Sequence, residues 1–285
     1  MKKVEEVLPF KGQVSLEGLY LGQELKEMAT KIGRSVVLTD FLTDKNGVVS
    51  KAGKDAQSQF QIPAEIKNSS DWGRFQELMA QADVTISSGS YFKRLATSQD
   101  ILYQFESGNA FEKLGQWRLS HGYKKRSPDL AVITRHLDFE LPKELLRSGR
   151  KIVIFTTDAV AISDRARALK NANTIILGDG ETDVDGGRLI TTLANEMGYR
   201  VIMMVSGPAV LNLLLTAKCL DLLYVTEAQV EIPFDDPATV RTMLSGGKKP
   251  SELKEFRLAH QFIQENVVTE AGSLISQSFL KYEKT

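Results

Sequence analysis

Short apolar runs, each bounded by polar or glycine-containing turns, recur along the chain and predict β-strands. They fall at residues 35–42, 83–87, 129–134, 151–156, 174–177 and 201–205. Because helical patterns lie between them, the alternation predicts an α/β fold with a mostly parallel central sheet and helices on both faces. The tail differs, since residues 256–263 and 274–282 are spaced like a hairpin. This spacing predicts an antiparallel C-terminal pair.

Polar residues followed by periodic apolar positions predict the helices. Asp71 is placed to cap a helix with one apolar face, formed by Trp72, Phe75, Leu78 and Met79. A second helix is predicted through Val160, Ala166 and Leu169. Asp185 is placed to cap a third, which ends before Gly198. Residues 51–69 have an irregular polar pattern, and residues 96–127 fit no element and are interpreted as an insertion.

The segment from Met203 to Val225 carries the strongest local signal. It predicts a buried strand, an abrupt Ser206-Gly207-Pro208 turn, an apolar helix and a second strand. Gly207 has no side chain, so the backbone can approach a ligand closely. The following helix presents its N–H groups and positive dipole end above the turn. This pattern predicts a site for an anionic group such as a dinucleotide phosphate, and the alternative is a tight strand–helix connection without a ligand.

Composition narrows the class of protein. The chain has 285 residues, of which 42% are hydrophobic and 25% charged, as in a soluble globular protein. Its 36 basic and 36 acidic residues give no net charge, so neither a nucleic acid nor an acidic membrane is indicated as a partner. Cys219 stands alone, which excludes a disulfide within the chain. The N-terminus lacks the apolar core of a signal peptide, and we expect a cytoplasmic protein.

Several kinds of site are not supported by the residues present. The histidines, His121, His136 and His260, are isolated, and one cysteine cannot complete a zinc site, so no metal is expected. The Gly-x-Ser-x-Gly turn of a hydrolase does not occur. Gly178-Asp179-Gly180 follows a strand, but Asp183 stands where a dinucleotide fingerprint needs its third glycine. We interpret that segment as a solvated loop.

Three predicted strands end in residues suited to phosphate. These ends are Ser88-Gly89-Ser90, Thr134-Arg135-His136 and Ser206-Gly207-Pro208. An arginine beside a hydroxyl can hold a phosphate through paired charge-assisted hydrogen bonds. Taken alone, each could be a solvated turn. Ligands of open α/β sheets bind at the carboxyl edge of the strands, where these three ends would meet.

In sequence order, these segments resemble the reductase of the riboflavin pathway, whose domain has the dihydrofolate-reductase-like fold. The family opens on a strand running into Ser-Leu-Asp-Gly, and this chain has FLTDKNGVVS there. The family's helix, strand and glycine turn correspond to DWGRFQELMAQADVTISSGSYFKRL, and its Ser-Arg or Thr-Arg strand end corresponds to LAVITRHLDFELP. The longest match is VDGGRLITTLANEMGYRVIMMVSGPAVLNLLLTAKCLDLLYVTEAQVEIP. The resemblance covers roughly residues 34–233.

The resemblance implies an NADPH-dependent reductase. It divides the chain into an N-terminal extension, residues 1–33, and one reductase domain, residues 34–285, and it implies a homodimer. It assigns the cofactor to the three strand ends, with the 2′-phosphate at Thr134 and Arg135. The pyrophosphate falls to Ser206, Gly207, Pro208, Ala209 and Val210, and the remaining turn is Ser88, Gly89 and Ser90.

The implied substrate is a phosphorylated aminopyrimidine, 5-amino-6-(5-phosphoribosylamino)uracil, whose ribosylamino group is reduced to ribitylamino. The resemblance places it near Thr43, Asn46, Gly47 and Val205, and Lys93 and Arg94 are candidates for its phosphate. Two residues depart from the family, because Val205 replaces a glutamate and Asn46 an aspartate. No catalytic residue is assigned. The alternatives are therefore a reductase of a pterin- or folate-like substrate, or a non-catalytic nucleotide-binding protein.

Overall fold

The computed structural model describes residues 2–53, 60–95 and 104–285, with the backbone alone for residues 93–95. Its centre is an eleven-stranded sheet. Across the sheet the strands are β2 (Gly12–Ser15), β1 (Lys3–Leu8), β12 (Phe256–Val268), β13 (Leu274–Lys284), β10 (Leu222–Ala228), β3 (Val36–Asp44), β9 (Val201–Met204), β5 (Val84–Ser88), β6 (Asp129–Ile133), β7 (Ile152–Thr156) and β8 (Thr174–Gly178). A separate pair joins β4 (Val48–Lys51) to β11 (Val240–Thr242).

The strand directions divide the sheet into two parts. Every neighbouring pair from β10 to β8 is parallel, whereas β13, β12, β1 and β2 each run antiparallel to the next. The predicted α/β fold, with a mostly parallel sheet and an antiparallel C-terminal hairpin, is therefore confirmed. The N-terminal segment lengthens the same sheet, since Glu5 of β1 is paired with Ile263 of β12. The domain boundary at residue 33 stays a prediction.

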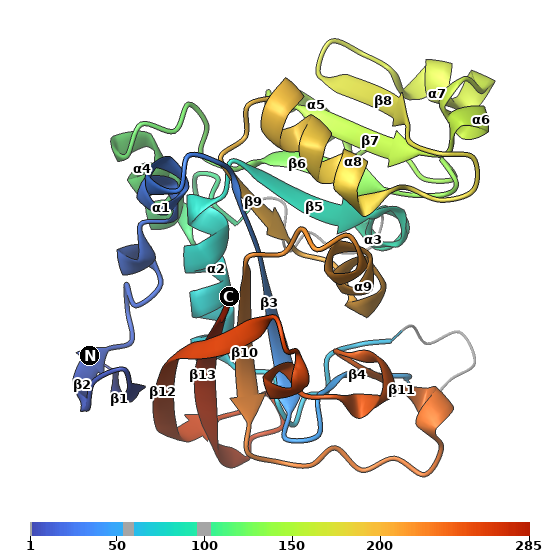
Figure 1. Ribbon diagram of the computed structural model, residues 1–285. Helices are drawn as coiled ribbons and strands as arrows, with labels where there is room; N and C mark the ends of the chain where they lie inside the picture. The colour runs from blue at the N-terminus through green and yellow to red at the C-terminus, as the bar shows by residue number, and fades with distance from the viewer. Residues whose placement is uncertain (1, 54–59, 96–103) are drawn as a thin grey trace.

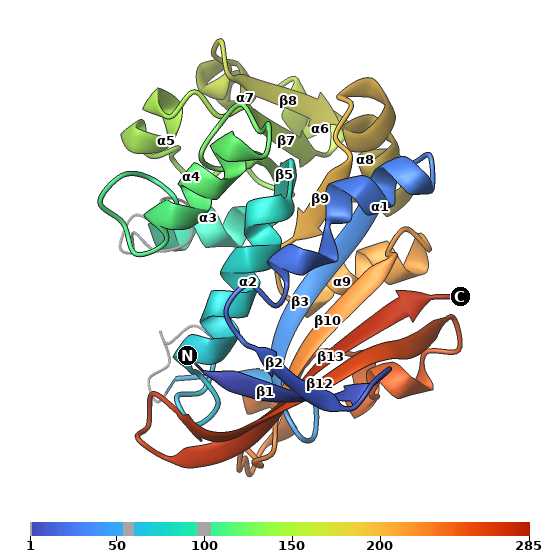
Figure 2. The same ribbon diagram turned by 90° about the vertical axis from the view of Figure 1, so that its left-hand side faces the viewer.

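Helices cover both faces of the sheet (Figures 1 and 2). On one face, which we call the α2 face, Val36, Leu38 and Met203 pack in the same core as Leu78 of α2. The helices on this face are α1 (Leu25–Lys31), α2 (Ser69–Gln81), α3 (Gly89–Leu95), α4 (Glu112–Ser120), α5 (Lys143–Arg147) and α7 (Asp164–Leu169). The opposite face is covered by α8 (Gly186–Thr191), the π-helical turn Thr192–Glu196 and α9 (Pro208–Thr216).

Several helix boundaries differ from the sequence prediction. Helix α2 is capped by Asn68, whose Oδ1 accepts from the N–H groups of Ser70 and Asp71 at 3.0 Å, so the prediction of Asp71 as the cap is wrong. The helix predicted through residues 160–169 is two short helices, α6 (Asp158–Ala161) and α7, because Ser163 caps the second. Asp185 caps α8 as predicted, accepting from the N–H of Arg188 at 2.8 Å.

Residues 96–127 contain one described helix, α4, and residues 96–103 of that range lie outside the described residues. Glycine in α4 permits a close packing contact, since a Cβ at Gly115 would overlap the carbonyl oxygen of Phe105. In the part of the chain that the structure describes, no helix is long and apolar enough to cross a bilayer.

Candidate functional site

The turn after β9 opens onto free space. Gly207 is the N-cap of α9, and Pro208 occupies the first helical position. A Cβ built on Gly207 would meet no heavy atom within 4 Å. Pro208 has no N–H, and the N–H groups of Val210 and Leu211 donate back to the Gly207 carbonyl at 3.1 and 3.3 Å. In the part of the chain that the structure describes, the Ala209 N–H has no acceptor, so it can donate to a ligand above this turn.

The ends of β5 and β6 meet beside this turn. Strand β5 continues through Ser88, and α3 begins directly at Gly89, so the prediction of a turn at residues 88–90 is wrong. A Cβ at Gly89 would overlap Oγ1 and Cβ of Thr134, the residue after β6. Glycine is required here by packing between two strand ends. The hydroxyl groups of Ser88 and Ser90 lie 2.8 Å apart and bond to each other.

Arg135 has a partner that the sequence did not indicate. Its Nε donates to Oδ1 of Asp183 at 2.5 Å, and both side chains are more than half exposed, at 68% and 57%. The ion pair raises the pKa of Arg135 and lowers the pKa of Asp183. A phosphate at Arg135 would have to displace this carboxylate. Asp183 lies in the loop after β8, so that loop contributes to the same edge of the sheet.

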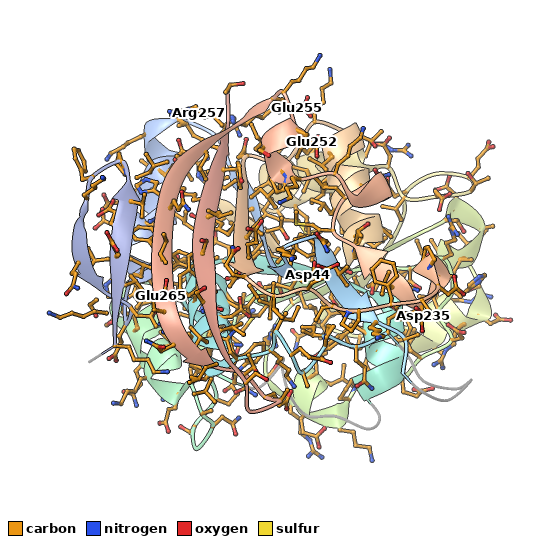
Figure 3. The ribbon with its side chains drawn as sticks, turned by 90° about the horizontal axis from the view of Figure 1, so that it is seen from below. Asp44, Asp235, Glu252, Glu255, Arg257 and Glu265 are labelled. Carbon is orange, nitrogen blue, oxygen red and sulfur yellow. The ribbon has the colours of Figure 1, made fainter. Side chains whose placement is uncertain are left out.

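The loop predicted to face the substrate is organised by a buried carboxylate (Figure 3). Asp44 accepts from the N–H groups of Asn46 and Val48 at 2.8 Å and from that of Ile232 at 2.9 Å. Gly47 has a φ of 81°, which favours glycine. The prediction of Thr43 in the loop is wrong, because β3 pairs with β10 as far as Asp44 and buries Thr43.

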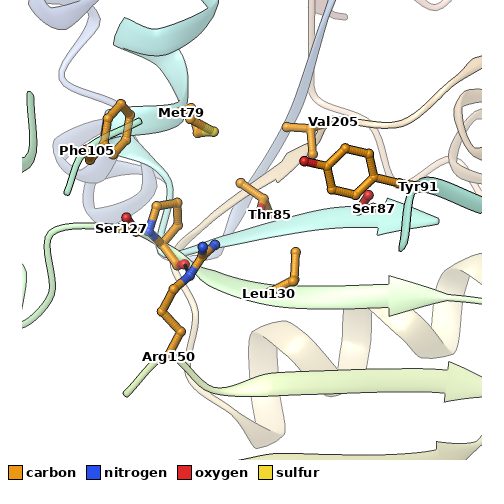
Figure 4. Close-up of a pocket in the computed structure, with 10 residues that line it drawn as sticks. Met79, Thr85, Ser87, Tyr91, Phe105, Ser127, Leu130, Arg150 and Val205 are labelled. Carbon is orange, nitrogen blue, oxygen red and sulfur yellow. Dashed lines mark hydrogen bonds between the residues drawn. The ribbon is translucent and has the colours of Figure 1, made fainter. Parts of the chain in front are cut away.

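Val205 lines a small cavity of about 10 Å³ on the α2 face. Figure 4 shows Val205, Tyr91 and Ser87 together toward the carboxyl end of β5, with Ser127 and Arg150 toward its amino end. The cavity is therefore next to the turn at Gly207. The side chains of Lys93 and Arg94 lie outside the described residues.

A buried group of acids and hydroxyls lies on the same face, and the sequence analysis did not identify it. We call it the acid cluster; its members are Asp40 of β3, Asp71 of α2, and Tyr224 and Thr226 of β10. Burial and the neighbouring Asp71 charge raise the pKa of Asp40 well above its usual range. Burial also raises the pKa of Asp71, to about 6, although Thr226 and Arg74 act in the opposite direction. One signal was present in the sequence, an aspartate inside an apolar strand.

The N-terminal segment covers the acid cluster. The ring of Tyr20 packs against that of Tyr224 with centroids 5.0 Å apart. Glu77 of α2 accepts from the N–H groups of Gly18 at 2.7 Å and Tyr20 at 2.9 Å, and it forms a buried ion pair with Arg74. The Tyr224 side of the cluster is therefore covered by a segment that precedes the predicted reductase domain, whereas Asp40 stays partly exposed.

The described residues contain no group of three or more His, Cys, Asp or Glu side chains arranged to hold a metal ion. A larger groove of about 560 Å³ lies elsewhere, between α1 and α4, and contains none of the predicted site residues. The Ser206–Gly207 peptide is trans, since among the described residues the cis bond is Leu8–Pro9.

No protein-family model matches the chain, and no curated protein sequence matches it either. Solved structures do. A pyrimidine reductase-like protein from Corynebacterium diphtheriae has a TM-score of 0.61 at 17% identity, over 95% of this chain and 99% of that one. A riboflavin biosynthesis reductase from Saccharomyces cerevisiae has a TM-score of 0.55 at 14% identity, over 93% and 99%.

RibD from Acinetobacter baumannii has a TM-score of 0.57 at 13% identity, over 90% of this chain. The chain spans 60% of the length of that protein. At these identities the likeness concerns the fold. The predicted resemblance is thereby confirmed at that level: the chain has the fold shared by these pyrimidine and riboflavin-biosynthesis reductases.

Proposed function

We propose that the protein is an NADPH-dependent reductase of the riboflavin-pathway type, acting on 5-amino-6-(5-phosphoribosylamino)uracil. The observation that carries the proposal is the open Gly207 turn at the start of α9, beside the joined ends of β5 and β6. An anion-binding turn at the carboxyl edge of a parallel sheet is where such folds bind nucleotides. The shared fold supports the reductase class.

The residues at this edge fit the cofactor in the following way. Ser206, Gly207 and Ala209 would hold the pyrophosphate, because Gly207 leaves room for it and α9 has no side-chain cap. Arg135 would hold the 2′-phosphate after exchanging Asp183 for it. When bound, NADPH supplies the hydride for the reduction.

The substrate would lie on the α2 face, between Val205 and the loop at Asn46 and Gly47. Val205 lines the cavity of that face, and the apolar side chain offers shape without charge. Lys93 and Arg94 remain candidates for its phosphate. We also propose that the protein works in the cytoplasm and that it forms a homodimer. Sedimentation of the purified protein tests the oligomeric state.

The decisive experiment has two stages. Binding is measured first, by thermal shift with NADPH, NADH, flavins and folates, where a ligand at 100 times its Kd adds about 2.7 kcal/mol to the unfolding free energy. Loss of absorbance of the reduced nicotinamide is then followed with the aminopyrimidine substrate and, separately, with dihydrofolate. Oxidation with the aminopyrimidine supports the proposal. Oxidation with dihydrofolate alone, or binding without oxidation by either, replaces it with one of the two alternatives.

A further inference from the structure

We propose that Asp40 is the proton donor of the reduction and that Asp71 is the positioning residue that maintains its protonated form. The inference rests on the proposed reductase function and concerns the acid cluster, to which no role has been assigned above.

The strand register places Asp40 at the point where the sheet opens. Strand β9 ends opposite β3 at the pair Thr39 and Met204, so Asp40 is the first residue of β3 beyond that pairing. On its other side Asp40 is paired with Tyr224 of β10. Alternation along β3 directs Asp40 to the α2 face, the face of Val36 and Leu38. Val205, which follows β9, packs against the core of that same face.

Three buried polar atoms of the cluster have no hydrogen-bond partner among the described residues. They are Oδ1 of Asp40, the phenol oxygen of Tyr224 and Oγ1 of Thr226. Tyr224 is fully buried, and Asp40 is partly exposed although its Oδ1 is not. Buried polar groups in folded proteins are almost always paired, so these atoms need a partner that the described protein atoms do not supply. A substrate hydroxyl or ether oxygen that reaches Asp40 from its exposed side would give its carboxyl group a partner.

The charged groups around the pair separate the roles of the two acids. From α2 come Asp71 and Arg74, and from the N-terminal segment comes Tyr20. Arg74 forms an ion pair with Glu77, so its positive charge offsets the negative charge of Asp71 only in part. Asp71 therefore ionises at lower pH than Asp40, and its negative charge raises the pKa of Asp40 further.

The remaining charges lie on β13, behind Tyr224. Lys281 is 6.0 Å from the centre of the Tyr224 ring, and it bonds to Gln23 at 2.8 Å and Glu283 at 3.0 Å. Burial raises the pKa of Tyr224, and the charges of Asp40 and Glu283 raise it further, so the phenol also keeps its proton. The carboxyl group nearest the end of β9 is thus held more strongly in its neutral form than the one on the helix.

The step balances with one proton from Asp40. The Asp40 carboxyl gives its proton to the ring oxygen of the ribosyl group as the bond from that oxygen to the anomeric carbon breaks. The same carbon gains the hydride supplied by NADPH, which is oxidised to NADP⁺. The Asp40 carboxylate then takes up a proton from water, and the net consumption is one NADPH and one proton for each ribitylamino product.

The first test compares Asp40→Asn, Asp71→Asn and a matched control with the wild type. The control is Asp221→Asn, a buried acid that is bound to Arg34 at the amino end of β3 and does not belong to the acid cluster. Asp40→Asn is expected to lower kcat by about 100-fold or more, the usual contribution of a general acid. Its NADPH affinity should stay within about twofold of the wild type, which shows that the variant is folded.

The pH profile separates a donor from a structural residue. Because the protonated carboxyl is the active form, kcat of the wild type should fall as the pH rises through the pKa of Asp40. Asp71→Asn should move this fall to lower pH, since it removes the negative charge that holds the proton. Asp221→Asn should keep the wild-type profile. An Asp40→Asn enzyme with wild-type kcat, or an Asp71→Asn profile at the wild-type position, overturns the proposal.

A second measurement does not depend on turnover. In protein with ¹³C-labelled aspartate carboxyl groups, the NMR resonance lost in Asp40→Asn should report a protonated acid at neutral pH, and in Asp71→Asn it should titrate at lower pH. An ionised Asp40 at neutral pH overturns the proposal. A wild-type protein that does not oxidise NADPH with the aminopyrimidine refutes the proposed function instead, and a protonated Asp40 in that sample still supports proton donation to another substrate.

Discussion

Glu77 holds the N-terminal segment onto helix α2, and Glu77→Ala is predicted to destabilise the protein strongly. Its carboxylate accepts from Nε and Nη2 of Arg74 at 3.0 and 2.5 Å and from the N–H groups of Gly18 and Tyr20. The side chains of Arg74 and Glu77 are 8% and 5% exposed. Removing the carboxylate leaves a buried guanidinium and two backbone donors without their acceptor.

The expected magnitude follows from the burial of the pair. Breaking a buried ion pair by removing one partner costs about 3–5 kcal/mol of unfolding free energy. For a chain of this size, about 2 °C of Tm is lost per kcal/mol, so the midpoint should fall by about 6–10 °C. The double variant Arg74→Met with Glu77→Leu should recover much of this loss, because no uncompensated charge remains.

Urea denaturation and thermal melting of the four proteins measure the effect. The control is Glu270→Ala, which breaks an exposed ion pair with Lys67 at 3.0 Å and should cost about 0.5 kcal/mol or less. If Glu77→Ala loses no more stability than Glu270→Ala, the carboxylate does not hold the N-terminal segment in the way described. The cover over Tyr224 is then maintained by other contacts, such as the ring packing of Tyr20 and the hydrogen bond from Gln81 to the Tyr20 carbonyl.

Three further predictions concern the site. Gly207→Val should abolish NADPH binding and leave the circular dichroism spectrum unchanged, because the branched side chain would occupy the space above the turn. If calorimetry shows normal NADPH affinity, the turn only connects β9 to α9 and binds no phosphate. Arg135→Ala should weaken NADPH by about ten- to a hundredfold and NADH little, whereas Asp183→Asn should strengthen NADPH; equal losses for both cofactors would contradict the 2′-phosphate assignment. The raised pKa of Asp71 means that the folded state binds the Asp71 proton more tightly than the unfolded state does. The contribution of Asp71 to stability is therefore fully present below about pH 4 and is lost as the pH rises through about 6. Asp71→Asn should flatten this part of a stability profile measured by urea denaturation, and an unchanged slope would contradict the burial argument.

The sequence predicted correctly those elements that are determined by residues close together in the chain. The turn at Gly207, the cap at Asp185 and the C-terminal hairpin each arise from residues close together in the chain, and each is present. Asn68 and Asp71 could both cap a helix, and the choice between them depends on burial, because Asn68 also bonds to Gln277 at 2.8 Å.

Contacts between distant residues account for what the sequence did not reveal. Asp183 reaches Arg135 only because the loop after β8 returns over β6, and nothing near either residue indicates that approach. Asp40 and Asp71 come together because α2 crosses the face of β3. The meeting of these charged groups is therefore a property of the tertiary fold, and the sequence shows only Asp40 inside an apolar strand without indicating its partners.

The position of β3 in the sheet has a consequence for the order in which the chain can assemble during synthesis. Both neighbours of this early, buried strand, β9 and β10, come from the last third of the chain. At about 5–20 residues per second, a ribosome needs roughly ten to thirty seconds to reach β9 after completing β3. During that time β5 to β8 can already pair with one another, while β3 remains without a neighbouring strand on either side. The central strand of the nascent chain thus keeps both of its edges unpaired, and that strand is where a chaperone would be expected to bind.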